Sequence, residues 1–166
     1  YTDGLALARG AENVVVLGTF SKIMGLAALR LGWAYAPAAV ADVLNRVRGP
    51  FNVSAPAQLA GEAALADTAH LAAAKAHNDR WRPWLTERLR ALGYVTTPSV
   101  ANFVLVRCAD PDAASAMLRV LEGGGVLARA MGAYGLPAAV RISVGLEAEN
   151  RRAIDLLRAA QAERVA

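Results

Sequence analysis

Apolar residues in the first part of the chain form short continuous runs that alternate with segments of helical spacing. The run NVVVLGTF, residues 13–20, is rich in β-branched residues and predicts a strand covered on both faces. The stretch LAALRLGWAYAPA predicts a short helical piece and then a strand that Pro37 stops. Residues 37–49 have proline before the first turn and glycine after the last, which is typical of helix ends. The pattern therefore indicates strand, helix, strand and helix up to about residue 68.

Helical spacing then resumes and persists over a long segment. Ser54 is placed to cap a helix in which Pro56 is tolerated in the first turn. From about Thr68 to residue 92 the spacing predicts one long helix that buries Trp81, Trp84 and Leu85 and ends at Gly93. These segments lead into a region of different composition.

Residues 94–166 alternate strands and helices in another order. The stretch YVTTPSVANFVLVRC is strand-rich, and Asp110 is the expected N-cap of the helix after it. Two further strands, in GGGVLARAM and AAVRISVG, precede a last helix with Glu147 and Glu149 near its positive end. We predict a partial α/β sheet in residues 1–68 and an α+β unit in residues 69–166.

Composition excludes several classes of function. The chain of 166 residues is 55% hydrophobic and 19% charged, which is typical of a globular protein with a large core. Its net charge of +4 comes from scattered arginines, so we expect no nucleic-acid partner. The apolar run from Ile23 to Leu44 is broken by Arg30, Pro37 and Asp42, so we expect no membrane span. A single cysteine, Cys108, excludes an intrachain disulfide and suits the cytoplasm.

Two histidines, His70 and His77, lie on the long predicted helix. We interpret both as solvent-facing helix residues, with a metal-binding pair as the alternative, and we expect no metal site.

The stretch TFSKIMGLAALRLGW raises a chemical question. Lys22 follows a hydroxyl residue and precedes Arg30 by eight positions in an otherwise apolar run. A buried lysine is costly unless it is neutral, paired or covalently used, and an apolar surrounding would lower its pKa toward the neutral, nucleophilic form. The turn after the strand also offers Thr19, Ser21 and backbone N–H groups to a phosphate dianion, and Arg30 can add a bidentate contact.

This stretch resembles the lysine segment of the fold-type I, pyridoxal-phosphate-dependent aminotransferases. The later stretches RGPFNVSAPAQ and AYGLPAAVRISVG resemble the histidinol-phosphate aminotransferase branch, and the resemblance runs along essentially the whole chain. It implies that Lys22 binds the cofactor covalently and acts as base and acid at the substrate α-carbon. It also implies that Ser21 and Arg30 bind the cofactor phosphate, with Thr19 a lesser candidate. The alternative for Arg30 is a helix arginine that reaches solvent.

Substrate recognition is expected near the C-terminal end. Arg141 is the one charged residue of AAVRISVG, and the resemblance implies that it binds the substrate carboxylate; the alternative is an edge-strand arginine facing water. Arg129 aligns, across a gap, with an arginine that the branch uses near the substrate phosphate, and a surface arginine is the alternative. Asn102 matches an asparagine at the active-site edge, although we interpret it as a turn cap.

The resemblance implies transfer of an amino group between L-histidinol phosphate and 2-oxoglutarate in histidine biosynthesis, by a cytoplasmic homodimer that uses pyridoxal 5'-phosphate. Its other partners are small amino-acid and 2-oxo-acid substrates. A related decarboxylase of phosphorylated amino acids and a non-catalytic small domain are the alternatives.

The resemblance also implies an incomplete enzyme. Members of the family are roughly twice this long, and their cofactor-binding aspartate and ring-stacking residue would precede residue 1. We therefore expect a C-terminal part, comprising the end of the large domain and the small domain, that is nearly inactive alone. We assign Tyr1 to a connecting loop. Two residues depart from the pattern: Gly18 replaces a frequent arginine, and Leu146 replaces the usual hydroxyl cap of the last helix.

Overall fold

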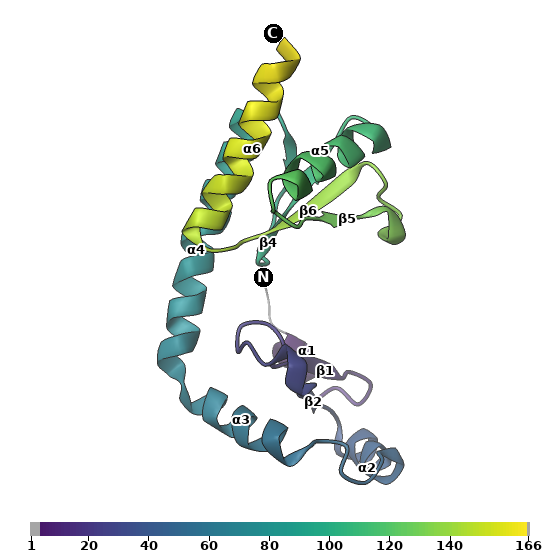
Figure 1. The fold of residues 1–166 in the computed structure, drawn as a ribbon. Coiled ribbons are helices and arrows are strands. Elements are labelled where there is room, and N and C mark those ends of the chain that lie inside the picture. The colour runs from purple at the N-terminus through teal and green to yellow at the C-terminus, as the bar shows by residue number, and fades with distance from the viewer. Residues whose placement is uncertain (1–3, 166) are drawn as a thin grey trace. The chain divides into compact units, whose positions relative to one another are not determined.

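A computed structural model describes residues 4–165 of the chain (Figure 1). The chain divides into two units, residues 1–75 and residues 76–166. This division falls a few residues beyond the boundary expected at residue 68, and the assignment of the two parts to a large and a small domain stays a prediction. The expectation for Tyr1 lies outside the described residues.

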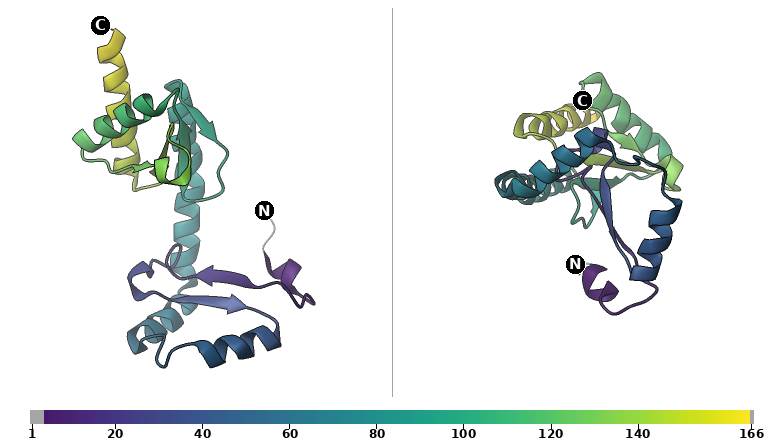
Figure 2. Two further views of the ribbon diagram at one scale, coloured as in Figure 1. Left: turned by 90° about the vertical axis from the view of Figure 1, so that its right-hand side faces the viewer. Right: turned by 90° about the horizontal axis from the view of Figure 1, so that it is seen from below.

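The first unit contains a two-stranded antiparallel sheet. Strand β1 (Val16–Thr19) pairs with β2 (Gly32–Tyr35), so that Val16 faces Tyr35 and Thr19 faces Gly32. Figure 2 shows the two strands running in opposite directions. The other elements are α1 (Gly4–Ala8), the 3-10 helix η1 (Ala27–Leu29), α2 (Ala38–Val47) and α3 (Ala55–Ala66). Both predicted strands and both predicted helices are confirmed.

The first strand is not covered on both faces, contrary to our expectation. Burial alternates along β1, and the Leu17 side chain is 77% exposed. Every residue of β2 is exposed, including Trp33 and Tyr35. A continuous apolar run predicts cover on both faces only when other elements pack there, and in the described part of the chain Leu17, Trp33 and Tyr35 stay exposed.

Helix α3 packs on the loop between the two strands. Ser54 caps it as predicted, because its Oγ accepts a hydrogen bond from Ala57 N at 3.4 Å. Ala57 is fully buried, and a Cβ built on Gly61 would lie 2.4 Å from Leu31 Cδ2 and 3.7 Å from Phe20 Cε1. The absence of a side chain at residue 61 therefore lets α3 approach the loop closely.

The second unit is a four-stranded antiparallel sheet with helices. Helix α4 (Thr68–Ala91) crosses the boundary between the units, and Gly93, with φ +81°, follows its end as predicted. The strands lie in the order β3-β4-β6-β5. Their bounds and those of the remaining helices are β3 (Val95–Thr97), β4 (Phe103–Arg107), α5 (Pro111–Gly123), β5 (Arg129–Ala130), η2 (Gly132–Tyr134), β6 (Ala139–Ser143) and α6 (Glu147–Val165).

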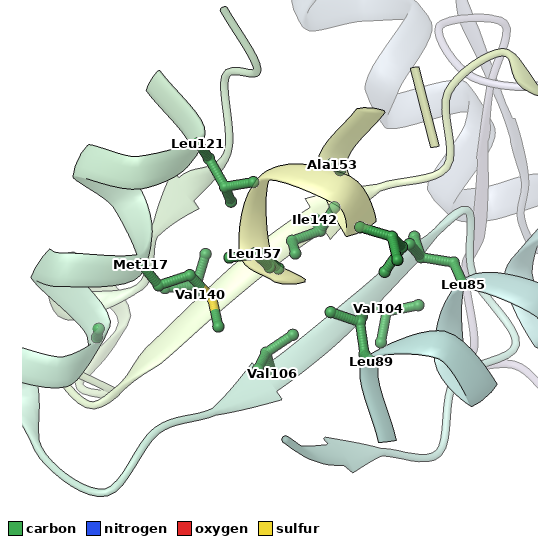
Figure 3. Close-up of a cluster of buried hydrophobic side chains, with 12 residues drawn as sticks. Leu85, Leu89, Val104, Val106, Met117, Leu121, Val140, Ile142, Ala153 and Leu157 are labelled. Carbon is green, nitrogen blue, oxygen red and sulfur yellow. The ribbon is translucent and has the colours of Figure 1, made fainter. Parts of the chain in front are cut away.

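The core lies on one face of this sheet. Alternate residues of β4 and β6 point to the same face and meet side chains of α4, α5 and α6 (Figure 3). The buried cluster consists of Leu85, Leu89, Val104, Val106, Ala114, Met117, Leu121, Val140, Ile142, Ala153, Ile154 and Leu157. The predicted burial of Trp81 and Leu85 is confirmed, whereas Trp84 is only partly buried. The other face of the sheet carries the remaining alternate residues, among them three arginines.

Both helices that follow the sheet strands have defined N-termini. Asp110 caps α5 as predicted, with Oδ1 accepting from Ala113 N at 2.7 Å. Leu146 precedes α6 without a side-chain acceptor, and Glu149 Oε2 instead accepts from Leu146 N at 2.7 Å. This is the carboxylate half of a capping box. No helix in the described residues has the length and apolar character needed to cross a membrane.

Candidate active site

The lysine segment is a loop closed at its base. Phe20 N donates to Leu31 O at 3.1 Å, and Leu26 N donates to Phe20 O at 3.0 Å. Phe20 itself is buried, so the loop is anchored by both its backbone and its apolar first residue. A turn at the tip is closed by Gly25 N donating to Lys22 O at 2.9 Å, with Gly25 at φ +71°. Lys22 is thereby presented on a hydrogen-bonded loop.

Three predicted phosphate-binding residues surround the base of this loop. Arg30 Nη1 donates to Ala27 O at 2.9 Å and to Ser21 Oγ at 3.5 Å, which brings Arg30 and Ser21 together. Thr19 Oγ1 accepts from Ser21 N at 3.0 Å, so Thr19 shapes the turn that carries Ser21. A guanidinium beside a hydroxyl is a donor pair suited to a phosphate monoester.

Arg30 adopts a left-handed backbone conformation. Its φ and ψ are 53° and 47°, and it follows the last residue of η1. For a residue with a Cβ this conformation costs about 1 to 2 kcal/mol, so glycine would be the residue of choice if only the turn mattered. The guanidinium stands at this strained position, and the strain is consistent with a functional role.

The surroundings of Lys22 are not the apolar ones that we expected. Lys22 is exposed, and so are the neighbouring residues Ile23 and Gly25. The apolar environment expected to favour the neutral amine is therefore not formed by the described residues.

The second candidate group lies on the open face of the four-stranded sheet. Arg141 of β6 stands directly between Leu105 of β4 and Arg129 of β5 in the strand register. Two like charges opposite each other on neighbouring strands repel. Their juxtaposition is stabilised when an anion lies close to both.

Arg141 is half-buried, and its Nε is a buried donor without a hydrogen-bond partner in the structure. Its guanidinium carbon lies 5.2 Å from the centroid of the Phe103 ring. Arg129 is exposed, and its guanidinium carbon lies 5.4 Å from the centroid of the Tyr134 ring. An unpaired buried donor is costly, so the group is prepared for an acceptor that an anionic ligand would supply.

The remaining candidates have structural partners. Asn102 is exposed and its main-chain carbonyl accepts from Val144 N at 2.9 Å, while the turn before β4 is held by Ser99 Oγ accepting from Ala101 N. The side chain that caps this turn is therefore Ser99 and not Asn102, which we had expected there. His70 Nε2 lies 3.1 Å from Ile23 O in the first unit.

His77 is half-buried rather than solvent-facing, because its Nε2 lies 2.9 Å from Gly145 O. A carbonyl can only accept, so this nitrogen carries the proton. Among the described residues there is no group of three side chains that could bind a metal ion.

Cys108 lines a cavity that neither Arg129 nor Arg141 lines. The cavity, about 510 Å³, lies between α5 and α6 at one end of the sheet and is lined by residues that include Tyr94, Cys108, Met117 and Leu157. Burial raises the pKa of the Cys108 thiol, and the carboxylate of Asp110 raises it further. The thiol is therefore held in its neutral, unreactive form.

Sequence reasoning missed the two aromatic rings beside the arginines. Phe103 lies two residues before Leu105, and alternation places both on the face that carries Arg141. The alternation of residues in NFVLVRC could have predicted that Phe103 lies on this face. The ring of Tyr134 lies in η2, after β5, where the sequence gives no periodicity that relates it to Arg129.

Comparison with known proteins identifies the family. The family described as aminotransferase class I and II matches residues 2–157. Histidinol-phosphate aminotransferase of Rhodopseudomonas palustris is 47% identical over 163 residues, which are 93% of this chain and 43% of that protein. The enzyme of the same name from Paramagnetospirillum magneticum is 50% identical over 161 residues, 95% of this chain and 44% of that protein. The chain thus spans less than half the length of these curated relatives.

Solved structures agree with the fold. Histidinol-phosphate aminotransferase of Sinorhizobium meliloti, in complex with pyridoxal-5'-phosphate, covers 91% of this chain and 43% of its own with a TM-score of 0.81 and 29% identity. The enzyme of that name from Clostridium acetobutylicum, at 18% identity, has a TM-score of 0.86 over 96% of this chain and 49% of its own, which shows the fold alone. The expected fold class, a C-terminal portion of a fold-type I transferase, is confirmed. From the match over residues 2–157, the chain belongs to the class I and II aminotransferases.

Proposed function

We propose that this chain is the C-terminal part of a pyridoxal-phosphate-dependent aminotransferase that exchanges an amino group between L-histidinol phosphate and 2-oxoglutarate. The observation that carries the proposal is the facing pair Arg129 and Arg141, with the unpaired buried Nε of Arg141. Both substrates are anions, and relatives at 47% and 50% identity are named histidinol-phosphate aminotransferase. The products are imidazole-acetol phosphate and L-glutamate.

The lysine loop fits the cofactor. Ser21 Oγ and the Arg30 guanidinium lie together, which suits a phosphate monoester, and Lys22 is exposed on the same loop. Pyridoxal 5'-phosphate, when bound, supplies the electron sink for the reaction. In this proposal Ser21 and Arg30 bind its phosphate, and Thr19 holds the Ser21 turn through the hydrogen bond to Ser21 N.

The protein residues divide the remaining work. Lys22 Nζ attaches the cofactor and takes and returns the proton of the substrate α-carbon. Arg141 binds the carboxylate of 2-oxoglutarate through its planar fork. When L-histidinol phosphate, which has no carboxylate, is bound instead, Arg129 binds its phosphate and Arg141 is the second donor to that group. This proposal assigns both arginines to recognition and leaves proton transfer to Lys22.

We also propose that the complete enzyme is a cytoplasmic homodimer. Exposed apolar side chains in the first unit support a further protein surface there, because Phe51 is 97% exposed and Leu17 is 77% exposed. The single cysteine is consistent with the cytoplasm. Light scattering of the complete enzyme tests the dimer.

A labelling experiment tests the cofactor site in this chain. The sequence holds two lysines, Lys22 and Lys75, so the second is an internal control for the first. The chain is incubated with pyridoxal phosphate, reduced with borohydride and mapped by mass spectrometry. Label concentrated on Lys22 supports the proposal. Equal label on Lys75 and on the terminal amine would contradict a specific site.

A chimaeric enzyme tests the reaction. The part of the Rhodopseudomonas palustris relative that precedes the matched residues is joined to this chain, and amino transfer from L-histidinol phosphate to 2-oxoglutarate is measured. We expect turnover that Lys22→Ala abolishes. Release of carbon dioxide from a phosphorylated amino acid in place of transfer would favour the decarboxylase alternative. A chimaera that folds and catalyses neither reaction would favour a non-catalytic chain.

A further inference from the structure

Each of the two facing arginines lies beside an aromatic ring from a different element. The Arg141 guanidinium lies by Phe103 of β4, and the Arg129 guanidinium lies by Tyr134 of η2. In the strand order β4-β6-β5, Phe103 and Arg129 are on opposite sides of β6. Arg141 therefore leans away from the strand that carries Arg129, although the two residues are direct partners in the register.

The two rings offset the repulsion between the positive charges of Arg129 and Arg141. Opposed arginines on neighbouring strands begin from closely spaced Cβ atoms. A ring face attracts a guanidinium within about 6 Å of its centroid, and both separations here, 5.2 Å and 5.4 Å, satisfy this. Each ring thus stabilises its guanidinium, as a carboxylate in an ion pair would. Unlike a carboxylate, the ring does not neutralise the positive charge.

No acidic residue occupies the strands of this face. The open-face residues of β4, β5 and β6 are Phe103, Leu105, Arg107, Arg129, Ala139, Arg141 and Ser143. None of these arginines has a carboxylate partner among the ion pairs found in the described part of the chain. Stacking on a ring leaves the N–H groups in the guanidinium plane directed outward, where an anion can accept from them.

We propose that Phe103 and Tyr134 are positioning residues of the anion site: each ring fixes one guanidinium so that the two arginines receive an anionic substrate group together. This inference rests on the proposed function for the identity of the anion, and it assigns residues to which that function gave no role. Phe103 determines the orientation of Arg141, whose Nε is the unpaired buried donor. Tyr134 determines the orientation of Arg129.

The chemical class of ligand follows from the pair. Two forks with fixed planes favour a tetrahedral dianion such as a phosphate monoester, which offers acceptors to both, over a single carboxylate, which saturates one fork. We therefore expect inorganic phosphate to bind this face more tightly than acetate does.

The test uses the 166-residue chain and inorganic phosphate as the probe. Binding is followed by the Nε–H resonances of ¹⁵N-labelled arginine, with acetate at the same ionic strength as the comparison. Phe103→Leu, which keeps an apolar side chain but removes the ring, is expected to weaken phosphate binding roughly threefold to tenfold. Phe103→Tyr is expected to retain it, and Tyr134→Phe and Tyr134→Leu form the corresponding pair for Arg129.

Two controls separate positioning from stability and from general charge. Circular dichroism and thermal unfolding of each variant establish that it is folded. Arg107→Gln removes a charge from the same face at a residue that is not a register partner of Arg129 or Arg141, so phosphate affinity should change less than in Phe103→Leu.

The possible outcomes are distinct. Loss of binding in Phe103→Leu with retention in Phe103→Tyr supports the positioning role. Equal binding in folded Phe103→Leu and the parent chain overturns it, provided that Arg141→Gln abolishes binding. If Arg141→Gln also leaves phosphate binding unchanged, the arginine pair is not an anion site, and the proposed function loses its substrate-binding residues.

Discussion

Arg30 reaches back over the lysine loop so that its Nη1 lies 3.5 Å from Ser21 Oγ, nine residues earlier. The same nitrogen is held at 2.9 Å by Ala27 O, and the backbone of Arg30 is left-handed. The backbone and the side chain therefore favour different residues at position 30. Glycine adopts the left-handed conformation without strain, whereas only arginine supplies the guanidinium. Substitutions that separate the two effects are available.

Substitutions of Arg30 should affect the stability of the fold and the binding of the cofactor phosphate separately. Arg30→Gly is expected to exceed Arg30→Ala by about 1 kcal/mol in free energy of unfolding, because alanine keeps the cost of the left-handed backbone. Both variants lose the guanidinium, so both should lose the preference of Lys22 for pyridoxal phosphate over pyridoxal, by about tenfold. Urea unfolding and borohydride labelling measure the two quantities. Equal stability of the two variants, or a preference retained in both, would refute this account.

The N-terminus of α6 predicts a stabilising substitution. Leu146 has no side-chain acceptor for the first turn, while Glu149 Oε2 already accepts from its N–H. Leu146→Ser adds the missing half of the capping box and should raise the free energy of unfolding by about 1 kcal/mol. Leu146→Ala, which removes the same apolar side chain without adding an acceptor, is the control. Thermal unfolding that ranks serine no higher than alanine would contradict the capping geometry.

Asp110 predicts how the reactivity of Cys108 depends on pH. Burial first, and then the Asp110 carboxylate, raises the pKa of this thiol. Asp110→Asn removes the negative charge and keeps a side-chain oxygen that can accept from Ala113 N. The thiolate should then form at lower pH, so iodoacetamide should react faster at pH 8, with the rate profile moved to lower pH. An unchanged profile would mean that burial alone sets the pKa.

Most elements of the fold could be predicted from local signals. Ser54 and Asp110 cap the helices that they were expected to cap, and Gly93 follows the end of α4, because these signals act within a few residues. The burial of β1 could not be predicted in the same way. Leu17 sits in a run typical of a covered strand, but cover depends on elements distant in sequence, and the described residues supply none.

The residues of the candidate site likewise differ in how far apart they lie in the sequence, and this decided which of their contacts could be predicted. Lys22, Ser21 and Arg30 are close in sequence, so one motif located them, and the structure brings Ser21 and Arg30 together. Arg129 and Arg141 become partners through strand register, which sequence spacing does not fix. Their roles in binding and catalysis stay predictions.

The buried amide of Asn150 yields a last prediction, on the connection after β6. Asn150 is 3% exposed; its Oδ1 accepts from Gly145 N at 2.9 Å and its Nδ2 donates to Gly145 O at 2.8 Å. Asn150→Ala leaves Gly145 N without this acceptor and should cost about 1 to 3 kcal/mol in free energy of unfolding. His77, at 2.9 Å from the same carbonyl, still offers Gly145 O one donor.

Asn150→Asp tests the direction of these hydrogen bonds through pH. A carboxylate can accept from Gly145 N but cannot donate to Gly145 O, so ionisation of the buried group is disfavoured and its folded-state pKa lies above the unfolded value of about 4. Below that value the carboxyl is protonated in both states and can donate, so this variant should approach the parent in stability. As pH rises through the folded-state pKa the deficit grows to its maximum. Urea unfolding from pH 3.5 to 8 measures it, with Asn150→Ala as the control whose deficit stays constant. A deficit in Asn150→Asp that does not vary with pH would contradict a buried side chain at residue 150 that donates to Gly145 O.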